Sequence, residues 1–262
     1  APSDYGRAAG LIMSENPLGG VCGAVCPDTH CMAACVHEKF DRPIEIPAVQ
    51  ATLVQKAKDL GVMPTFAKAR PTGKKVAVVG AGPAGLGAAA MLAQRGHAVT
   101  VLEAGDEAGG MALLIPDSRL DKRVLASDIA FLTTLGDITI KTGTRVDDPR
   151  ALLADYDTVL VTSGLDEPIS LSIPGEDAAV SWVDYLATPK KYRVKGKRVG
   201  IIGGGAVAVD CAELAREFGA ESVELFALET FAEMPLTTSE RQTLIDCDIC
   251  VSGRTRVTRI GK

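Results

Sequence analysis

The sequence has 262 residues, of which 47% are hydrophobic, and its net charge is −5 at pH 7. A chain of this length buries about 70–75% of its unfolded surface, so its core needs no disulfides. No apolar run reaches the roughly 18 residues of a transmembrane helix, and no basic block indicates nucleic-acid binding. We therefore expect a cytoplasmic protein with neither a membrane nor a nucleic-acid partner.

Four of the seven cysteines are grouped in the stretch NPLGGVCGAVCPDTHCMAACVHE, at positions Cys22, Cys26, Cys31 and Cys35. An odd total with a tight group favours metal or cluster ligation over disulfides in the cytosol. Thiolates suit both a closed zinc site and an iron–sulfur cluster. From the spacing alone, a disulfide pair, structural zinc and a redox cluster all stay open.

Short helices are predicted around these cysteines, within residues 1–70. The stretch AVQATLVQKAKDLGV, residues 48–62, has apolar residues at helical spacing, and Gly61 ends the helix. The polar stretch KARPTGKK, residues 68–75, contains Pro and Gly and is typical of a linker. We place the first domain boundary in this linker.

A strand, a glycine-rich turn, a helix and a second strand follow in residues 75–103, and the turn GAGPAG fits G-x-G-x-x-G. Gly80 permits the tight turn, Gly82 lets the backbone approach a pyrophosphate, and Gly85 lets helix and strand pack closely. The phosphates would lie at the helix N-terminus. Glu103 closes the second strand, where a carboxylate can accept hydrogen bonds from a ribose.

The same plan returns in residues 196–229, where GGGAVA fits G-x-G-x-x-A after the strand RVGII. Two further strands are predicted between the two units, in DITIKTGTRV and YDTVLVTSG. Two strand–helix–strand units about 120 residues apart form a repeat at the scale of a domain. The sequence therefore predicts an α/β protein with two Rossmann-like domains after a helical segment.

The first of these units, with its continuation, resembles a known family. GAGPAG followed by VTVLEAGDEAGGM resembles the FAD type of the fingerprint, and GGMALLIPDSRL is similar to the glutamate synthase small-subunit family. YDTVLVTSG resembles the strand that this family places beside the flavin, and IPGED at 173–177 also matches. The resemblance covers nearly the whole chain. It extends to the amino-terminal part of dihydropyrimidine dehydrogenase and to the large subunit of electron-bifurcating transhydrogenases.

The resemblance implies FAD in the first glycine turn, with Glu103 on the adenosine ribose. It also implies NAD(P)H in the second turn, facing the flavin, so that hydride passes from nicotinamide to flavin and no acid–base residue is needed. The residues expected around FAD are Gly80, Gly82, Pro83, Ala84, Gly85, Glu103, Ala104, Gly110, Met111, Arg119, Val146 and Gly164. Those expected around the nicotinamide nucleotide are Gly203, Gly204, Gly205, Ala206, Val207, Ala208 and Glu229.

The second turn departs from the family in two places. Ala206 and Val207 stand where the family usually has Asn-Thr, which removes side-chain hydrogen bonds to the nucleotide. Leu228 and Glu229 stand where the family often has two arginines for the NADP 2′-phosphate. A carboxylate repels that phosphate, so NAD(H) is favoured over NADP(H). Because both changes remove contacts, an empty and degenerate site is the alternative.

The resemblance also implies 4Fe–4S clusters at the cysteine-rich segment. By analogy, Cys26 and Cys31 would ligate one cluster and Cys35 the other. Gln50 would be a further ligand, and Cys22 is a candidate ligand or a bystander. The family's upstream cysteines and its closing carboxy-terminal segment are not in this sequence. We therefore expect missing segments of the same protein or other redox subunits to complete the unit, unless the four cysteines hold one cluster alone.

A second cysteine pattern, C-x-x-C, joins Cys247 and Cys250 in LIDCDICVSG. We expect a strand here, which would place the two cysteines on opposite faces as buried residues instead of a redox pair.

These inferences define three domains: a helical iron–sulfur segment at 1–70, an incomplete FAD-binding domain at 71–168 and an incomplete NAD(P)-binding domain at 169–262. The predicted function is an oxidoreductase module that passes electrons between NAD(P)H, FAD and 4Fe–4S clusters to a partner subunit. The alternative is an electron-wiring or scaffold subunit of a larger redox complex, with a degenerate NAD(P) site.

Overall fold

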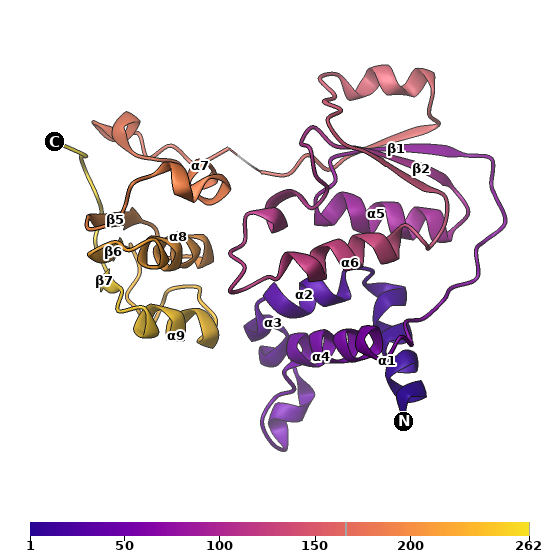
Figure 1. Ribbon diagram of the computed structural model, residues 1–262, viewed down its shortest axis with the longest axis horizontal. Helices are drawn as coiled ribbons and strands as arrows, with labels where there is room; N and C mark the ends of the chain where they lie inside the picture. Colours follow the sequence, from indigo (N-terminus) through magenta and orange to yellow (C-terminus); the bar gives the residue numbers. More distant parts are fainter. Residues whose placement is uncertain (166, 262) are drawn as a thin grey trace. The chain divides into compact units, whose positions relative to one another are not determined.

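The computed structural model describes residues 1–165 and 167–261, and it forms two compact units (Figure 1). The first unit comprises residues 1–113 and 117–165, and the second comprises residues 114–116 with the residues after Leu165. The cysteine-rich helical segment and the first glycine turn, which we predicted in separate domains, therefore lie in one compact unit.

The first unit starts with four α-helices and one 3-10 helix. They pack closely because small residues let their backbones approach: a Cβ on Gly23 would lie 2.5 Å from the Ala51 backbone nitrogen. Met13, Val54 and Ala57 are buried between them. The elements are α1 (Pro2–Glu15), α2 (Gly19–Val25), α3 (Asp28–Ala33), η1 (Val36–Lys39) and α4 (Ile46–Asp59).

A parallel four-stranded sheet, ordered β3-β2-β1-β4, forms the nucleotide-binding part of the same unit. The register of β1 with β2 runs from the pair Lys75↔Ala98 to the pair Val79↔Leu102. Central β1 is apolar and buried after its first residue, as a parallel strand covered on both faces should be. The strands are β1 (Lys75–Val79), β2 (Ala98–Leu102), β3 (Ile138–Lys141) and β4 (Thr158–Val161).

Helix α5 (Pro83–Gln94) covers one face of this sheet, α6 (Lys122–Leu132) lies against α5, and α2 and α4 form the next layer beyond α6 (Figure 1). Two 3-10 helices, η2 (Gly110–Leu113) and η3 (Pro149–Ala154), lie in the connections. Helix α6 thus lies between the cysteine-bearing α2 and the nucleotide fold, in contact with α2 and with α5.

The second unit has a parallel three-stranded sheet ordered β5-β6-β7. Its core includes Val209, Ala212, Val223, Leu225 and Leu244. The elements are η4 (Glu176–Ala178), α7 (Trp182–Ala187), η5 (Pro189–Lys191), β5 (Arg198–Ile202), α8 (Ala206–Glu217), β6 (Ser222–Phe226), α9 (Thr238–Asp246) and β7 (Cys250–Ser252).

The predicted strand across Cys247 and Cys250 is wrong for its first half. Helix α9 extends to Asp246, and Cys247 caps it at its C-terminus. Asp248 then takes a left-handed conformation with φ of 52°, and β7 begins only at Cys250, whose side chain is exposed instead of buried.

No helix in the described residues combines the length and the apolar character needed to cross a bilayer.

Candidate functional site

The first glycine turn is built by two glycines that have no room for a side chain. Gly80 has φ of +101°, and a Cβ there would lie 2.5 Å from the Thr162 carbonyl oxygen. A Cβ on Gly85 would lie 2.0 Å from the Gly80 carbonyl oxygen. The N–H of Gly80 donates to the carbonyl of Leu102 at 2.8 Å, which ties the turn to β2. These glycines therefore shape the turn itself, as the motif predicts.

The middle glycine of the turn faces open space. A Cβ on Gly82 would meet only the Cα of Gly110 within 4 Å, at 3.9 Å. Gly82 is also the N-cap of α5, which has no side-chain cap, so the first N–H groups of this helix are free for an anion. Pro83 occupies the first turn, where its missing N–H costs nothing. The arrangement fits the pyrophosphate of a dinucleotide.

A second glycine pair packs on this turn. Gly110 has φ of +55°, and a Cβ there would lie 2.7 Å from the Gly82 Cα. The N–H of Gly109 donates to the Ala81 carbonyl at 2.9 Å. A Cβ on Gly109 would lie 2.9 Å from a methyl carbon of Leu125 on α6. The two glycines that follow β2 thus lie between the glycine turn and α6. The next residue, Met111, is half-buried in η2.

Glu103 follows β2 directly, and its side chain contacts the backbone of the same turn. Its Oε2 accepts a hydrogen bond from the Ala81 N–H at 2.7 Å, and its Oε1 accepts one from the Gly105 N–H at 2.8 Å. Each carboxylate oxygen keeps a further lone pair, so the same side chain can also accept from ribose hydroxyls. The carboxylate is held in place before any nucleotide arrives.

Thr162 braces the turn from β4, and the sequence reasoning missed it. Its hydroxyl donates to the carbonyls of Val79 and Gly80 at 2.9 and 3.1 Å. The signal was present in the stretch YDTVLVTSG, because a residue at the end of the neighbouring parallel strand must meet the turn. Gly164 follows two residues later with φ of +81°.

The remaining residues predicted around FAD all lie in the first unit. Ala104 is exposed beside Glu103. Arg119 is half-buried before α6, and Val146 is half-buried after β3. Ala84 is exposed in the first turn of α5. The structure thus brings the glycine turn, Glu103 and Gly110 together, while the roles of Arg119 and Val146 stay predictions.

The second glycine turn repeats the geometry of the first. Gly203 has φ of +143°, and its N–H donates to the Phe226 carbonyl at 3.0 Å. A Cβ on Gly205 would meet nothing within 4 Å, and Gly205 is the N-cap of α8 without a side-chain cap. The turn is open to an anion at the same place as the first. Ala206, Val207 and Ala208 form the apolar first turn of α8.

Glu229 lies over this second turn. A Cβ on Gly204 would lie 3.0 Å from Glu229 Oε2. In the first unit Leu102 pairs with Val79, the last residue of β1, and Glu103 follows it. In the second unit Phe226 pairs with Ile202, the last residue of β5, so the residue equivalent to Glu103 is Ala227. Glu229 therefore reaches the turn from two residues further along the chain.

The loop that bears Glu229 is held by two arginines, which the sequence reasoning missed. Arg241 on α9 donates to the carbonyls of Phe231, Ala232 and Met234, at 2.6 Å for Met234, and its guanidinium lies over the Phe231 ring. Glu233 accepts from the backbone and hydroxyl of Thr230 and pairs with Arg254 at 2.8 Å. The hydrogen bonds from Thr230 hold the pKa of Glu233 below its usual range.

The cysteines are spread over three elements. Cys22 is half-buried on α2, Cys26 is exposed at its C-cap, Cys31 is half-buried on α3 and Cys35 precedes η1. Among the described residues, no three His, Cys, Asp or Glu side chains come together in a way that could hold a metal ion. The assignment of each cysteine to a cluster therefore stays a prediction.

Cys35 and Cys22 have different surroundings. Backbone N–H groups of Ile44 and His37 donate to the Cys35 sulfur and lower the pKa of its thiol. Such donors favour the thiolate, which is the form that ligates iron. Burial raises the pKa of Cys22, although a hydrogen bond from Asn16 opposes this effect. Cys35 thus fits a cluster ligand better than Cys22 does.

Gln50 lies near Cys22 through a shared neighbour. Its Oε1 accepts a hydrogen bond from the Asn16 side chain at 3.4 Å, and Asn16 also bonds the Cys22 thiol. The structure therefore places Gln50 in the surroundings of the cysteine that the sequence analysis treated as a possible bystander.

A separate apolar groove of about 750 Å³ lies in the second unit, along the free edge of β5. Trp182, Tyr185, Tyr192 and Phe226 line it, and none of the glycines of the second turn does. The groove is therefore lined by residues other than the glycines of the second turn.

Two family models match the chain. Residues 74–260 match the pyridine nucleotide-disulphide oxidoreductase family, and residues 1–62 match the 4Fe–4S cluster domain II of dihydropyrimidine dehydrogenase. The gap between the two matches, residues 63–73, overlaps part of the polar stretch at residues 68–75.

Curated relatives cover most of the chain at about one-third identity. The beta subunit of the NADP(+)-dependent formate dehydrogenase of Moorella thermoacetica is 34% identical over 90% of this chain and 38% of its own length. The glutamate synthase (NADPH) small chain of Bacillus subtilis is 34% identical over 82% of this chain and 47% of its own length. The PreT subunit of the NAD-dependent dihydropyrimidine dehydrogenase of Escherichia coli is 33% identical over 90% and 59%. The chain thus spans about half the length of these relatives.

Solved structures share the fold. A 2-naphthoyl-CoA reductase in complex with 2-naphthoyl-CoA has a TM-score of 0.62 at 25% identity, over 79% of this chain and 32% of that one. The thioredoxin reductase of T. acidophilum has a TM-score of 0.52 at 22% identity, over 72% and 67%.

Proposed function

The chain belongs to the pyridine nucleotide-disulphide oxidoreductase family and has the 4Fe–4S segment of dihydropyrimidine dehydrogenase domain II; on that premise we propose that it passes electrons between NAD(P)H, FAD and 4Fe–4S clusters for a partner subunit. The match to glutamate synthase small chains and to PreT confirms the resemblance drawn from the sequence. The order of electron flow and the partner are part of the proposal.

One observation supports this function above the others: both glycine turns are open at the position where a phosphate must approach. Gly82 and Gly205 each cap a helix of 12 residues without a side-chain cap, and each faces open space. In each case a glutamate lies at the turn. Two nucleotide sites in one chain are what hydride transfer from a nicotinamide to a flavin requires.

The residues of this chain bind and orient in the proposed reaction. When bound, FAD supplies the chemistry of accepting a hydride and releasing single electrons. The free N–H groups of α5 would hold its pyrophosphate, and Glu103 would fix its ribose. Cys35, with its backbone N–H donors, would hold a cluster as a thiolate.

We propose NAD(H) for the second site. A carboxylate at Glu229 accepts hydrogen bonds from a free ribose 2′-hydroxyl and repels a 2′-phosphate. Its position over Gly204 supports this choice, and exposed Leu228 offers no positive charge. Two of the relatives are named for NADP(+) or NADPH and one for NAD, so the choice of NAD(H) rests on the second turn of this chain and on Glu229 above all.

A subunit that only wires electrons or serves as a scaffold, with a degenerate second site, is the alternative. Ala206 and Val207 favour it, because the first turn of α8 offers no side-chain hydrogen bond to a nucleotide. A nucleotide at this turn would depend on backbone N–H groups alone for contacts to its phosphates from the start of α8.

The relatives support the proposal of a partner subunit and of a longer complete unit. The three relatives are named as subunits or as a chain of larger enzymes, and the chain covers 38–59% of their length. We propose that further segments of the same protein or another redox subunit complete the cluster ligands and the flavin site.

The test is anaerobic titration of the protein, purified together with the segments or subunit that complete it, with NADH and with NADPH while flavin absorbance is recorded. The proposal expects FAD, iron and acid-labile sulfide in the protein and bleaching at lower NADH than NADPH concentrations. Flavin that neither nucleotide bleaches would favour the wiring subunit, and the absence of flavin would favour the scaffold.

A further inference from the structure

Asp128 is a fully buried carboxylate that joins two parts of the first unit. It lies on α6 with 0% of its side chain exposed. Its Oδ2 accepts a hydrogen bond from the Val21 N–H at 2.9 Å, and its Oδ1 pairs with Lys58 Nζ at 2.7 Å. Val21 lies on α2 and Lys58 on α4, at separations of 107 and 70 residues in the sequence.

The carboxylate replaces a cap that α2 does not have. Leu18, at the N-cap of α2, makes no side-chain hydrogen bond to the helix, and α2 has only seven residues. Asp128 satisfies one of its first N–H groups from outside and places a negative charge at its positive end. A helix this short is marginal alone, so its position depends on such contacts.

Gly20 makes this contact possible. A Cβ at Gly20 would lie 2.9 and 3.0 Å from the two carboxylate oxygens and 3.0 Å from a methyl carbon of Val124 on α6. The glycine therefore lets α2 approach α6 closely enough for the Val21 N–H to reach Asp128. The two cysteines of this helix segment, Cys22 and Cys26, follow within one and a half turns.

Helix α6 also contacts the two-glycine segment that packs on the turn where FAD is proposed to bind. Leu125, one turn before Asp128, packs against Gly109, and the next residue, Gly110, packs against Gly82. The same helix thus touches the cysteine helix with one residue and the phosphate-binding segment with another. All the residues that make these contacts belong to the first unit.

A buried charge pair contributes little net stability, because well-packed apolar residues in its place often stabilise a fold equally well. Such a pair can, however, fix the position of one element relative to another. We propose that Asp128 is a positioning residue that holds α2, and with it Cys22 and Cys26, at a fixed place relative to the flavin turn. This inference rests on the proposed electron transfer between flavin and cluster. Residues that orient the ligands of a metal centre typically change its affinity or activity about 10–100-fold when they are replaced.

The experiment compares the Asp128→Leu/Lys58→Met double variant of the intact holoprotein with wild type. The double variant removes both charges of the pair together, so neither is left unpaired, and it leaves the Val21 N–H without its acceptor. Asp121→Asn removes a carboxylate from the N-cap of the same helix, keeps an oxygen that can cap it, and is the matched control. Asp128→Asn, which keeps an oxygen acceptor, is the second variant in case the double variant does not fold.

Three quantities are measured: hydrogen exchange of the amides in residues 19–25, flavin content with its bleaching by NADH, and the rate at which cluster absorbance changes after the flavin is reduced. For the double variant we expect the amides of residues 19–25 to exchange about tenfold faster or more. We expect the cluster to be reduced by the flavin about tenfold more slowly or more. Flavin content and bleaching should stay as in wild type, and Asp121→Asn should match wild type throughout. Asp128→Asn should give smaller changes of the same sign.

The inference is overturned if the amides of residues 19–25 exchange as in wild type. It is also overturned if they exchange faster while the rate of cluster reduction stays unchanged. Loss of flavin together with the cluster step also overturns it, because Asp128 would then support the whole fold. If wild type itself is not bleached by NADH or contains no iron, the proposed function fails instead. Hydrogen exchange in residues 19–25 then decides the positioning role alone.

Discussion

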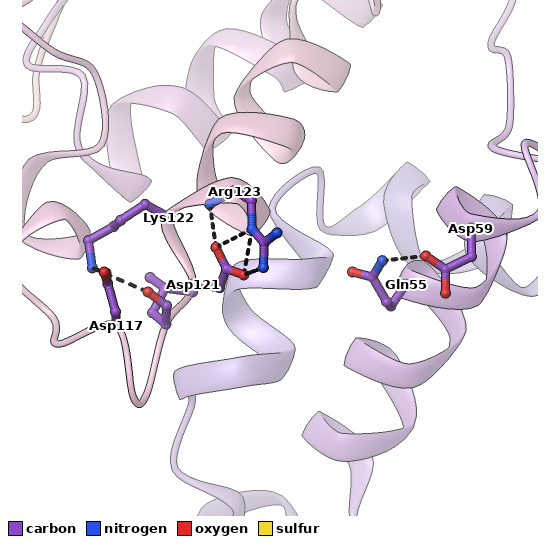
Figure 2. Close-up of polar contacts among 7 residues, drawn as sticks. Gln55, Asp59, Asp117, Asp121, Lys122 and Arg123 are labelled. Atoms are coloured by element: carbon purple, nitrogen blue, oxygen red, sulfur yellow. Dashed lines mark hydrogen bonds and ion pairs between the residues drawn. The ribbon is translucent and has the colours of Figure 1, made fainter.

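Arg123 holds the Asp121 carboxylate at the start of α6 through two nitrogens, with Nε at 2.9 Å and Nη2 at 2.5 Å from Oδ2 (Figure 2). Asp121 is also the N-cap of the helix, and it accepts from the Arg123 backbone N–H at 2.8 Å. These bonds lower the pKa of Asp121 from 3.8 to about 2. The start of α6 is therefore held by an ionised carboxylate over most of the acid range.

This pair gives a prediction about pH. Because the pKa of Asp121 is lower in the folded state, its contribution to stability is complete above the ordinary pKa of 3.8 and is lost as the pH falls toward about 2. Urea unfolding of wild type and Asp121→Asn should differ slightly at pH 6, because the pair is exposed, and the difference should shrink as the pH falls toward about 2. A difference that grows as the pH falls would contradict the assignment.

Glu103→Ala should weaken FAD binding about tenfold or more. The variant loses hydrogen bonds of a charged acceptor to the turn, each worth about 1.5–3 kcal/mol, and the proposed bonds to the ribose. The measurement is flavin content after dialysis at limiting FAD. Glu107→Ala removes an exposed acid from the same loop and is the control. Full flavin in Glu103→Ala would show that the ribose does not bind there.

Gly82→Ala and Gly85→Ala should fail in different ways. A Cβ fits at Gly82, whose φ of −73° suits alanine, so stability should be unchanged while FAD binding falls about tenfold or more. A Cβ at Gly85 collides with the Gly80 carbonyl, so that variant should lose about 1–3 kcal/mol or more of stability. Thermal unfolding of the apoprotein and flavin titration separate the two effects. Tight FAD binding by Gly82→Ala would argue against the open glycine as the phosphate site.

Glu229→Arg should shift the preference of the second site toward NADPH. The change replaces a repelling carboxylate with a side chain that binds phosphate in a bidentate way, so the ratio of kcat/KM for NADPH over NADH should rise about tenfold or more. Glu221→Arg, an exposed change just before β6, makes the same change in charge away from the turn. An equal shift in both variants would indicate a general effect of charge, and Glu229 would lose its role.

The purified protein should contain iron and acid-labile sulfide and no stoichiometric zinc. Cys35→Ser should lose most of the iron of its cluster, because a serine hydroxyl is a poor ligand for iron compared with a thiolate. Cys250→Ser changes an exposed cysteine in the second unit and should keep the wild-type iron content. Elemental analysis with one zinc per chain and no iron would refute the cluster.

The parts of the fold that depend on local chemistry could be predicted from the sequence. The strand, turn, helix and strand of residues 75–103 and 196–229 were predicted in the right order, because glycines and apolar runs fix them within a few residues. Helix α4 was predicted from its spacing, with Gly61 just after it in a left-handed conformation. The family itself was predicted from GAGPAG and its continuation, and the family matches confirm it.

Contacts between distant residues could not be predicted in this way. Asp128 reads as a polar residue of an amphipathic helix, and nothing near it in the sequence shows that it bonds Val21. The support of the Glu229 loop by Arg241 is hidden for the same reason. Helix α9 is different: Thr237 and Glu240 form a capping box, a local signal that the strand prediction for this region overlooked.

The external cap on α2 has a consequence for the order of events during synthesis. Asp128 is made 107 residues after Val21, which at about 5–20 residues per second is a delay of roughly 5–21 s. During that time a helix of seven residues cannot persist on the growing chain. Cys22 and Cys26 are therefore made before the residue that places their helix, and assembly of any cluster on them should wait until Asp128 has been made.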